Sequence, residues 1–234
     1  MPLVLVHSPL VGPATWEALA AVIAGRDHEV LAPDLTSSLT EGPPYWARQV
    51  DAITHSAAGR RVMLVGHSGA GPLLAAAGNA LGRVVGYVFV DAGLPIPGQS
   101  WMETAPPALV QQLRAMAQDG WLPPWSAWWG ADGLAELLPD QGVRERFAAG
   151  CPRVPMAMFE EAQPPVPGWP DAPCAYLRLS GAYEEPAERA RELGWPVAEL
   201  ASHHLGVLTD PELVVGPLLE LVRRLGSNRS RTGR

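Results

Sequence analysis

The stretch RVMLVGHSGAGPLLAAAG, residues 61–78, decides the fold. An apolar run stops at Gly66, and a second apolar run begins after a short glycine-rich segment. A buried strand that passes directly into a helix needs small residues at the turn, so that strand and helix do not collide. Gly66 and Ala70 supply them on either side of Ser68, and Pro72 fits the first turn of a helix, where its missing N–H costs little. The stretch therefore predicts a strand, a sharp turn with Ser68 at its apex, and a helix.

Strand and helix patterns alternate on both sides of this stretch. Continuously apolar segments predict strands, and the segments between them carry apolar residues at helical spacing. Because the strands are apolar along their whole length, we expect an α/β fold: a mostly parallel sheet of about six strands with helices on both faces. The predicted strands are 3–6, 28–35, 62–65, 84–93, 174–181 and 196–200; the predicted helices are 15–24, one around Trp46, Val50 and Ile53, 69–81, 187–194 and 211–225.

A long insertion interrupts this alternation after residue 94. It is crowded with proline and tryptophan, and its helical patterns are short. The C-terminal residues are polar and basic, with nothing to bury, which is typical of a disordered tail. The expected division of the chain is a core formed by 1–94 and 174–225, an inserted cap formed by 95–173, and a disordered tail at 226–234.

Composition excludes several classes of function. The net charge of −7 argues against a nucleic-acid partner. No apolar stretch approaches the ~20 residues of a membrane helix, and the N-terminus lacks the basic segment of a secretion signal. We therefore expect a cytoplasmic protein with no membrane partner, in which Cys151 and Cys174 stay reduced. All basic residues are arginines, which excludes a lysine nucleophile.

The turn at Ser68 matches a nucleophile elbow, in which a serine hydroxyl stands above the carboxyl edge of the sheet next to a helix N-terminus. Its glycine spacing does not fit a nucleotide-binding G-x-G-x-x-G turn. The chain resembles proteins of the α/β-hydrolase fold, in the branch of small esterases that also contains plant hydroxynitrile lyases and methylesterases. The segments that carry the resemblance are LVLVHSPLVGPATW (3–16), HEVLAPDL (28–35), VMLVGHSGAG (62–71) and SHHLGVLTDPE (202–212).

A serine nucleophile needs a base within hydrogen-bond reach and an acid that orients the base. The resemblance implies the chain order serine, acid, histidine. It also implies a catalytic histidine seven residues before the proline that opens the last helix. His204 has this spacing from Pro211, and His203 is one residue too far. We predict His204 as the base of Ser68, with His203 as a neighbouring loop residue.

Three carboxylates are candidates for the acid. The resemblance implies the position three residues after Gly181, where this chain has Glu184. Asp91, at the end of the predicted strand 84–93, is the alternative acid, because some hydrolases of this fold take it from that strand. Glu185 is a third candidate that solvation alone also explains. The prediction is Glu184, with Asp91 kept open.

The oxyanion hole is predicted to use the N–H of Gly69 and a second N–H from the loop after the first strand. In that loop the family has His-Gly-x, and this chain has His7-Ser8-Pro9. Because proline has no N–H, Pro9 cannot donate, and Leu10 is the nearest backbone donor. The hydroxyl of Ser8 is a further candidate.

These residues predict a serine hydrolase that cleaves a small-molecule ester, lactone or thioester with an apolar or aromatic acyl group, without cofactor or metal. The alternatives are an acyltransferase, lyase or cyclase that uses the same pocket, and a ligand-binding protein without activity. The oligomeric state stays open. Residues expected to line the substrate pocket are Pro9, His67, Trp125, Trp128 and Trp129, although the cap tryptophans equally fit a small core of the cap itself.

Overall fold

The computed structural model describes residues 1–232, apart from the side chains at positions 131 and 228–232. Its core is a six-stranded sheet with the order β2-β1-β3-β4-β7-β8, in which every neighbouring pair is parallel. The central strands are buried along nearly their whole length, in keeping with their continuous apolar runs. The strands are β1 (Leu3–Val6), β2 (Val30–Leu31), β3 (Val62–Ser68), β4 (Val84–Ala92), β7 (Cys174–Arg178) and β8 (Val197–Glu199).

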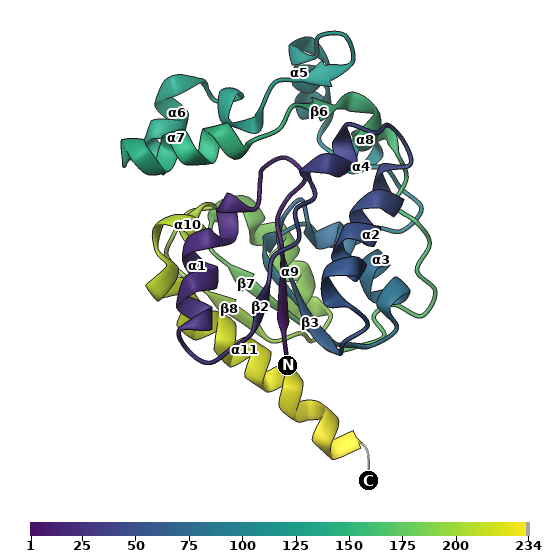
Figure 1. Cartoon of the computed structure of the whole chain (residues 1–234). Coiled ribbons are helices and arrows are strands. Elements are labelled where there is room, and N and C mark those ends of the chain that lie inside the picture. Colours follow the sequence, from purple (N-terminus) through teal and green to yellow (C-terminus); the bar gives the residue numbers. More distant parts are fainter. Residues whose placement is uncertain (233–234) are drawn as a thin grey trace.

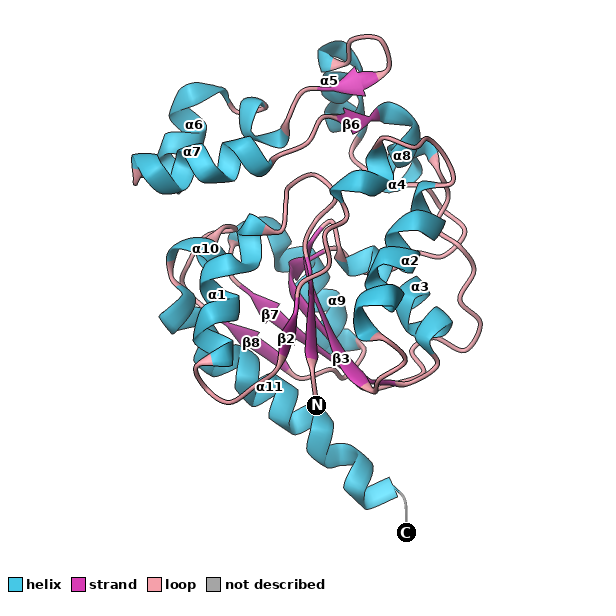
Figure 2. Cartoon of the chain, viewed as in Figure 1, coloured by secondary structure: helices cyan, strands magenta, loops and turns pink. Residues whose placement is uncertain are grey.

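Helices cover both faces of this sheet (Figure 2). Successive residues of β1 point to opposite faces, so Leu3 and Leu5 belong to one hydrophobic cluster and Val4 and Val6 to the other. Helices α1 and α11 pack in the first cluster, and α2, α3 and α9 pack in the second. The predicted mostly parallel sheet with helices on both faces is confirmed. The helices are α1 (Ala14–Ala24), α2 (Tyr45–Ala57), α3 (Gly71–Leu81), α9 (Glu184–Glu192), α10 (Gly206–Thr209) and α11 (Pro211–Thr232), with short 3-10 helices η1 (Thr36–Leu39) and η3 (Gly181–Tyr183).

The segment 95–173, predicted to be an inserted cap and called the cap below, consists of short elements between β4 and β7. In Figure 1 these teal and green elements lie together above the core, and β1 starts at the opposite end of the core. The parallel strands therefore run toward the cap, and the carboxyl edge of the sheet faces it. The elements of the cap are α4 (Trp101–Thr104), α5 (Pro107–Met116), β5 (Trp121–Leu122), η2 (Trp125–Ala127), α6 (Gly130–Leu137), α7 (Gln141–Gly150), β6 (Val154–Pro155) and α8 (Met156–Glu160), with β5 and β6 antiparallel.

Several strands differ in length from their predictions. Strand β7 ends at Arg178 and not at residue 181, and β4 and β8 are shorter than predicted by one and two residues. In the segment 28–35 only Val30 and Leu31 pair with β1. This strand lies at the edge of the sheet, and Pro33 follows it without an N–H for further pairing. Strand β3, in contrast, continues past the predicted 62–65 to Ser68 and so carries the glycine-rich segment into the sheet.

The C-terminal helix α11 is longer than predicted. It continues through residue 232, so the structure has a helix where a disordered tail was expected at 226–232. Residues 233–234, the rest of that predicted tail, lie outside the described residues. Among residues 1–232 no helix, α11 included, is long and apolar enough to cross a membrane.

Candidate active site

The turn between β3 and α3 places Ser68 above the carboxyl edge of the sheet. Ser68 has a φ of 59°, a left-handed conformation that is strained for a residue with a side chain. The pairing of β3 with β4 shifts register between His67 and Ser68. A Cβ atom built on Gly71 would overlap with the carbonyl oxygen of Gly93, so this close approach of α3 to β4 requires glycine. The predicted sharp turn is present.

Ser68, His204 and Asp91 form a continuous chain of hydrogen bonds. The Oγ of Ser68 lies 3.0 Å from Nε2 of His204, and Nδ1 of His204 lies 2.9 Å from Oδ2 of Asp91. Ser68 ends β3, Asp91 lies near the end of β4 with a φ of 44°, and His204 comes from the loop between β8 and α10. The structure thus brings together the predicted nucleophile, the predicted base and the alternative acid.

Asp91 is held in place by three further hydrogen bonds. Its Oδ1 accepts from the backbone N–H groups of Leu179 at 2.8 Å and Ser180 at 3.0 Å, and its Oδ2 accepts from Oγ of Ser180 at 2.6 Å. Burial alone would raise the pKa of Asp91, but the hydrogen bonds from His204, Ser180 and Leu179 together hold that pKa below its ordinary value. Asp91 is therefore a buried, ionised acceptor that fixes the ring of His204.

The structure corrects the choice of Glu184 as the acid. The carboxylate of Glu184 lies 3.1 Å from Nη1 of Arg178 and 3.3 Å from Nη1 of Arg191, and its side chain is 44 % exposed. Glu184 begins helix α9, and Glu185, the third candidate, is exposed beside it. The two arginines hold Glu184 in a surface ion-pair network, and the histidine is oriented by Asp91 instead.

His203 contacts Thr209 and not Ser68, unlike its neighbour His204. Its Nε2 lies 3.0 Å from Oγ1 of Thr209, within the same loop and helix α10. His204 alone of the two faces Ser68, as the spacing from Pro211 predicted.

The ring of His204 stacks with two other rings. His67 lies at a centroid distance of 4.5 Å and Tyr183 at 4.9 Å, with interplanar angles of 28° and 10°. Nε2 of His67 donates to the carbonyl oxygen of His204 at 2.8 Å. Burial, together with the neighbouring His204, lowers the pKa of His67 to about 3, so this ring is neutral. His67 thus fixes the backbone and the ring plane of His204 and is not a residue that lines an open pocket.

Sequence reasoning missed Tyr183. Its hydroxyl lies 3.2 Å from Oγ of Ser68. Tyr183 is the last residue of the 3-10 helix η3, which begins three residues after the end of β7, and it stands one residue before Glu184. The available signal was its place after a strand that ends at the same sheet edge as β3, but no motif marks a tyrosine there.

The loop after β1 contacts Gly69, the residue that follows Ser68. A Cβ atom on Gly69 would lie 2.8 Å from Oγ of Ser8, so glycine is needed for this contact. The N–H of Leu10 donates to the same Oγ at 3.2 Å. The predicted backbone donor, Leu10, is therefore already engaged, and Pro9 has no N–H to offer.

A comparison with protein families agrees with this geometry. The model described as "Alpha/beta hydrolase family" matches residues 3–216. The chain belongs to the alpha/beta hydrolase family. This confirms the fold-level resemblance of its sequence. A comparison with curated proteins gives no match.

Solved structures share the fold of this alpha/beta hydrolase at low sequence identity. An extracellular alpha/beta-hydrolase from a Paenibacillus species has 18 % identity and a TM-score of 0.74 over 97 % of this chain and 99 % of that one. Tomato methylketone synthase I, complexed with 2-tridecanone, has 16 % identity and a TM-score of 0.72 over 96 % and 98 %. A pyrethroid hydrolase from Sphingobium faniae JZ-2 has 18 % identity and a TM-score of 0.70 over 95 % and 97 %.

In this alpha/beta hydrolase, the three tryptophans predicted to line the substrate pocket, Trp125, Trp128 and Trp129, pack mainly within the cap. The ring of Trp125 contacts Phe147 and Trp129 edge-to-face, at 5.9 and 6.1 Å between centroids. Nε1 of Trp128 donates to a backbone carbonyl oxygen of the cap at 2.9 Å. Trp129 is 49 % exposed. The cluster that contains Trp125 also includes Leu205, the neighbour of His204, so the cap packs against the loop that carries the base.

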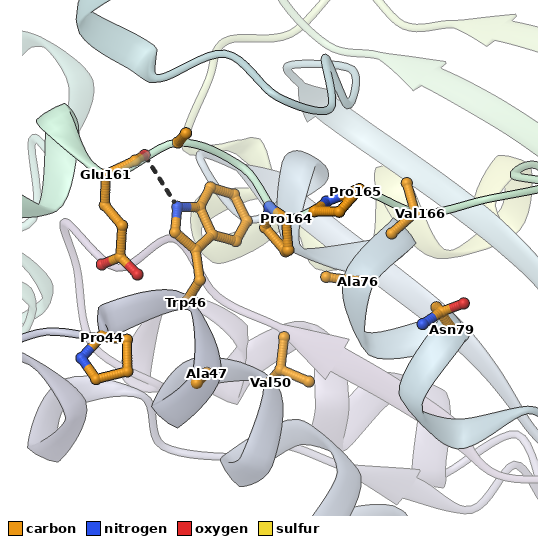
Figure 3. Close-up of a pocket in the computed structure, with 11 residues that line it drawn as sticks. Pro44, Trp46, Ala47, Val50, Ala76, Asn79, Glu161, Pro164, Pro165 and Val166 are labelled. Carbon is orange, nitrogen blue, oxygen red and sulfur yellow. Dashed lines mark hydrogen bonds between the residues drawn. The ribbon is translucent and has the colours of Figure 1, made fainter.

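A pocket of about 350 Å³ lies away from Ser68, between α2, α3 and the end of the cap (Figure 3). Its walls include none of the predicted site residues. Glu161 joins the cap to α2 there: its carboxylate accepts from the N–H of Tyr45 at 2.7 Å, and its carbonyl oxygen accepts from Nε1 of Trp46 at 3.2 Å. The lining residues are Pro44, Trp46, Ala47, Val50, Ala76, Asn79, Glu161, Ala162, Pro164, Pro165 and Val166.

Proposed function

We propose that this alpha/beta hydrolase is a serine hydrolase that cleaves a carboxylic ester, lactone or thioester through an acyl-enzyme. The observation that carries the proposal is the unbroken chain of hydrogen bonds from Ser68 through His204 to Asp91. A nucleophile, a base and a buried carboxylate in this order are what acyl transfer by serine requires.

The hydrogen bonds define the direction of proton transfer. A carboxylate only accepts, so Nδ1 of His204 donates to Asp91, and Nε2 carries the free lone pair. The hydroxyl of Ser68 donates to that Nε2. During attack on the carbonyl carbon, His204 takes the proton of Ser68 and then delivers it to the leaving group. Asp91 stabilises the imidazolium that forms.

The negative charge on the carbonyl oxygen needs donors on the side of the β1 loop. We infer that they are the N–H of Gly69 and the hydroxyl of Ser8. In residues 1–232 the Gly69 N–H makes no hydrogen bond. The Oγ of Ser8 accepts from Leu10, and its proton has no acceptor in the same part of the chain. Ser8 therefore takes the role first predicted for Leu10.

The acyl group is proposed to be apolar or aromatic. The chain contains nine tryptophans, and five of them (positions 101, 121, 125, 128 and 129) belong to the cap elements that face the carboxyl edge of the sheet. A sixth tryptophan between β4 and β7, Trp169, packs instead against Phe89 and Trp195 in the core. Aromatic and aliphatic side chains around a few polar groups are typical of a site for such a ligand.

Labelling with a fluorophosphonate probe tests the proposal. Such probes react with an activated serine, so the wild-type chain should gain one adduct at Ser68, located by peptide mass spectrometry. Ser68→Ala should abolish labelling and ester hydrolysis. Ser227→Ala, which changes an exposed serine of α11, is the matched control and should leave both unchanged. Equal labelling and hydrolysis by the Ser68→Ala variant would refute the proposal.

A second candidate is a non-hydrolytic reaction in the same site, such as acyl transfer or a lyase reaction. It is favoured by the loop after β1, in which Pro9 lacks an N–H and the N–H of Leu10 is engaged, so that a second backbone donor is missing. Turnover in ¹⁸O-labelled water distinguishes the two reactions. Hydrolysis incorporates ¹⁸O into the carboxylate product, whereas transfer or rearrangement does not.

A further inference from the structure

The hydrogen-bonding capacity of Ser68 determines what Tyr183 does. Oγ of Ser68 has one proton, and that proton is donated to Nε2 of His204. In its contact with Tyr183, at 3.2 Å, Oγ can therefore only accept. The hydroxyl of Tyr183 is the donor. Burial raises the pKa of Tyr183, so the phenol keeps its proton at neutral pH.

Tyr183 lies on the opposite side of Ser68 from Ser8, one of the two proposed oxyanion donors. In the sheet, β3 lies between β1 and β4, and β7 follows on the far side of β4. Ser8 belongs to the loop after β1, whereas Tyr183 follows β7. The tyrosine hydroxyl thus contacts the serine oxygen itself, and it does so from the side of the sheet away from Ser8.

We propose that Tyr183 is a catalytic residue that stabilises the oxygen of Ser68 as the leaving group when the acyl-enzyme is hydrolysed. The proposal rests on the proposed serine-hydrolase function. In this step a water molecule gives one proton to His204 and forms a bond to the acyl carbon. The bond from that carbon to Oγ of Ser68 then breaks, and the proton on His204 passes to Oγ. Tyr183 donates a hydrogen bond to Oγ throughout and keeps its own proton.

This hydrogen bond strengthens more in deacylation than in acylation. In the acyl-enzyme, Oγ is an ester oxygen and a weak acceptor, and it gains negative charge as the bond to carbon breaks. In the free enzyme, Oγ already accepts from Tyr183 before attack, so less is gained. A donor that faces developing charge contributes more than one between neutral groups. Loss of the hydroxyl should slow deacylation by roughly 10- to 100-fold and acylation by less than about 3-fold.

Tyr183→Phe tests this, because phenylalanine keeps the ring that stacks on His204 and removes only the hydroxyl. Stopped-flow measurement with a p-nitrophenyl ester gives the acylation rate from the burst and the deacylation rate from the steady state. Intact-protein mass spectrometry measures the acyl-enzyme that accumulates. Tyr87→Phe is the matched control, since its hydroxyl bonds to Asp171 and it lies four residues before Asp91 on β4.

The expected result for Tyr183→Phe is a burst of one product per site, a slow steady state and an acyl adduct on most of the protein. Tyr87→Phe should keep the wild-type ratio of the acylation rate to the deacylation rate. Tyr183→Leu, which also removes the stacked ring, should slow acylation as well. Equal slowing of both steps in Tyr183→Phe, or no change in either, would overturn the role of Tyr183. Full hydrolysis by Ser68→Ala would instead overturn the serine-hydrolase function itself.

Discussion

Replacement of Asp91 by asparagine is the sharpest test of the acid. Oδ1 of Asp91 accepts from two backbone N–H groups, so the amide oxygen of asparagine will occupy that position. The amide NH₂ then takes the place of Oδ2 and faces Nδ1 of His204. To accept from it, His204 must move its proton to Nε2, where it faces Ser68 and cannot act as a base. In a serine, histidine and aspartate triad this tautomer change lowers kcat by about 10⁴-fold, or about 5 kcal/mol of activation free energy.

Steady-state hydrolysis of a p-nitrophenyl ester measures this loss, with circular dichroism to show that the variant is folded. Ser180, whose Oγ now donates to Oδ2, can accept from the new amide, so we expect the fold to persist. Glu184→Gln is the matched control. Its exposed side chain contacts two arginines and not His204, so kcat should change by less than about 2-fold. A variant Asp91→Asn that keeps a tenth of the wild-type kcat, or a Glu184→Gln variant that loses as much as Asp91→Asn, would refute the reasoning.

Three further predictions concern stability and reactivity. The pKa of His67 is about 3 in the fold and about 6.5 in the unfolded chain, so below pH ~6.5 only the unfolded state gains this proton. Unfolding free energy should therefore fall as the pH drops from ~6.5 toward ~3, by up to about 1.4 kcal/mol per pH unit; His67→Gln should flatten this dependence in urea titrations. Gly71→Ala should lower the unfolding free energy by about 1–3 kcal/mol, because its Cβ overlaps with a backbone carbonyl, whereas Gly226→Ala, in an open part of α11, should raise it by about 0.5–1 kcal/mol. Cys151 and Cys174 are free and buried, and burial raises the pKa of the Cys151 thiol to about 11 and also raises the pKa of the Cys174 thiol. A thiol reagent should therefore modify them only in denaturant. Rapid modification of the native chain would contradict this prediction.

Local patterns in the sequence predicted the sheet and two members of the hydrogen-bond chain. The apolar run before Ser68 and the small residues around it impose a strand and a sharp turn, and these are short-range constraints. His204 could be chosen over His203 because the resemblance to the family implies a catalytic histidine seven residues before the proline that opens the last helix, and only His204 has this spacing from Pro211. In both cases the deciding information lies within about ten residues of the residue itself.

The choice of acid could not be made in the same way. Whether a carboxylate reaches His204 depends on partners that are distant in sequence. Arg191 and Arg178 draw Glu184 outward, while the backbone N–H of Leu179 draws Asp91 inward. One sequence signal did favour Asp91: it is the only charged residue in a nine-residue strand that is otherwise apolar, and a buried charge of that kind needs several partners.

The position of the acid on β4 has a consequence for the loop after β7. A second carboxylate from that loop would lie near Asp91, and two buried like charges would raise the pKa of one of them. The loop instead turns Glu184 to the surface and places the neutral hydroxyl of Tyr183 on Ser68. His67, the other ring on His204, is neutral as well. Asp91 is then the one ionised group in contact with His204 among the described residues, which keeps it available to stabilise the imidazolium. A neutral hydrogen-bond donor from the loop after β7 is therefore compatible with an ionised acid on β4. A second acid in that loop would instead disfavour the ionised form of Asp91.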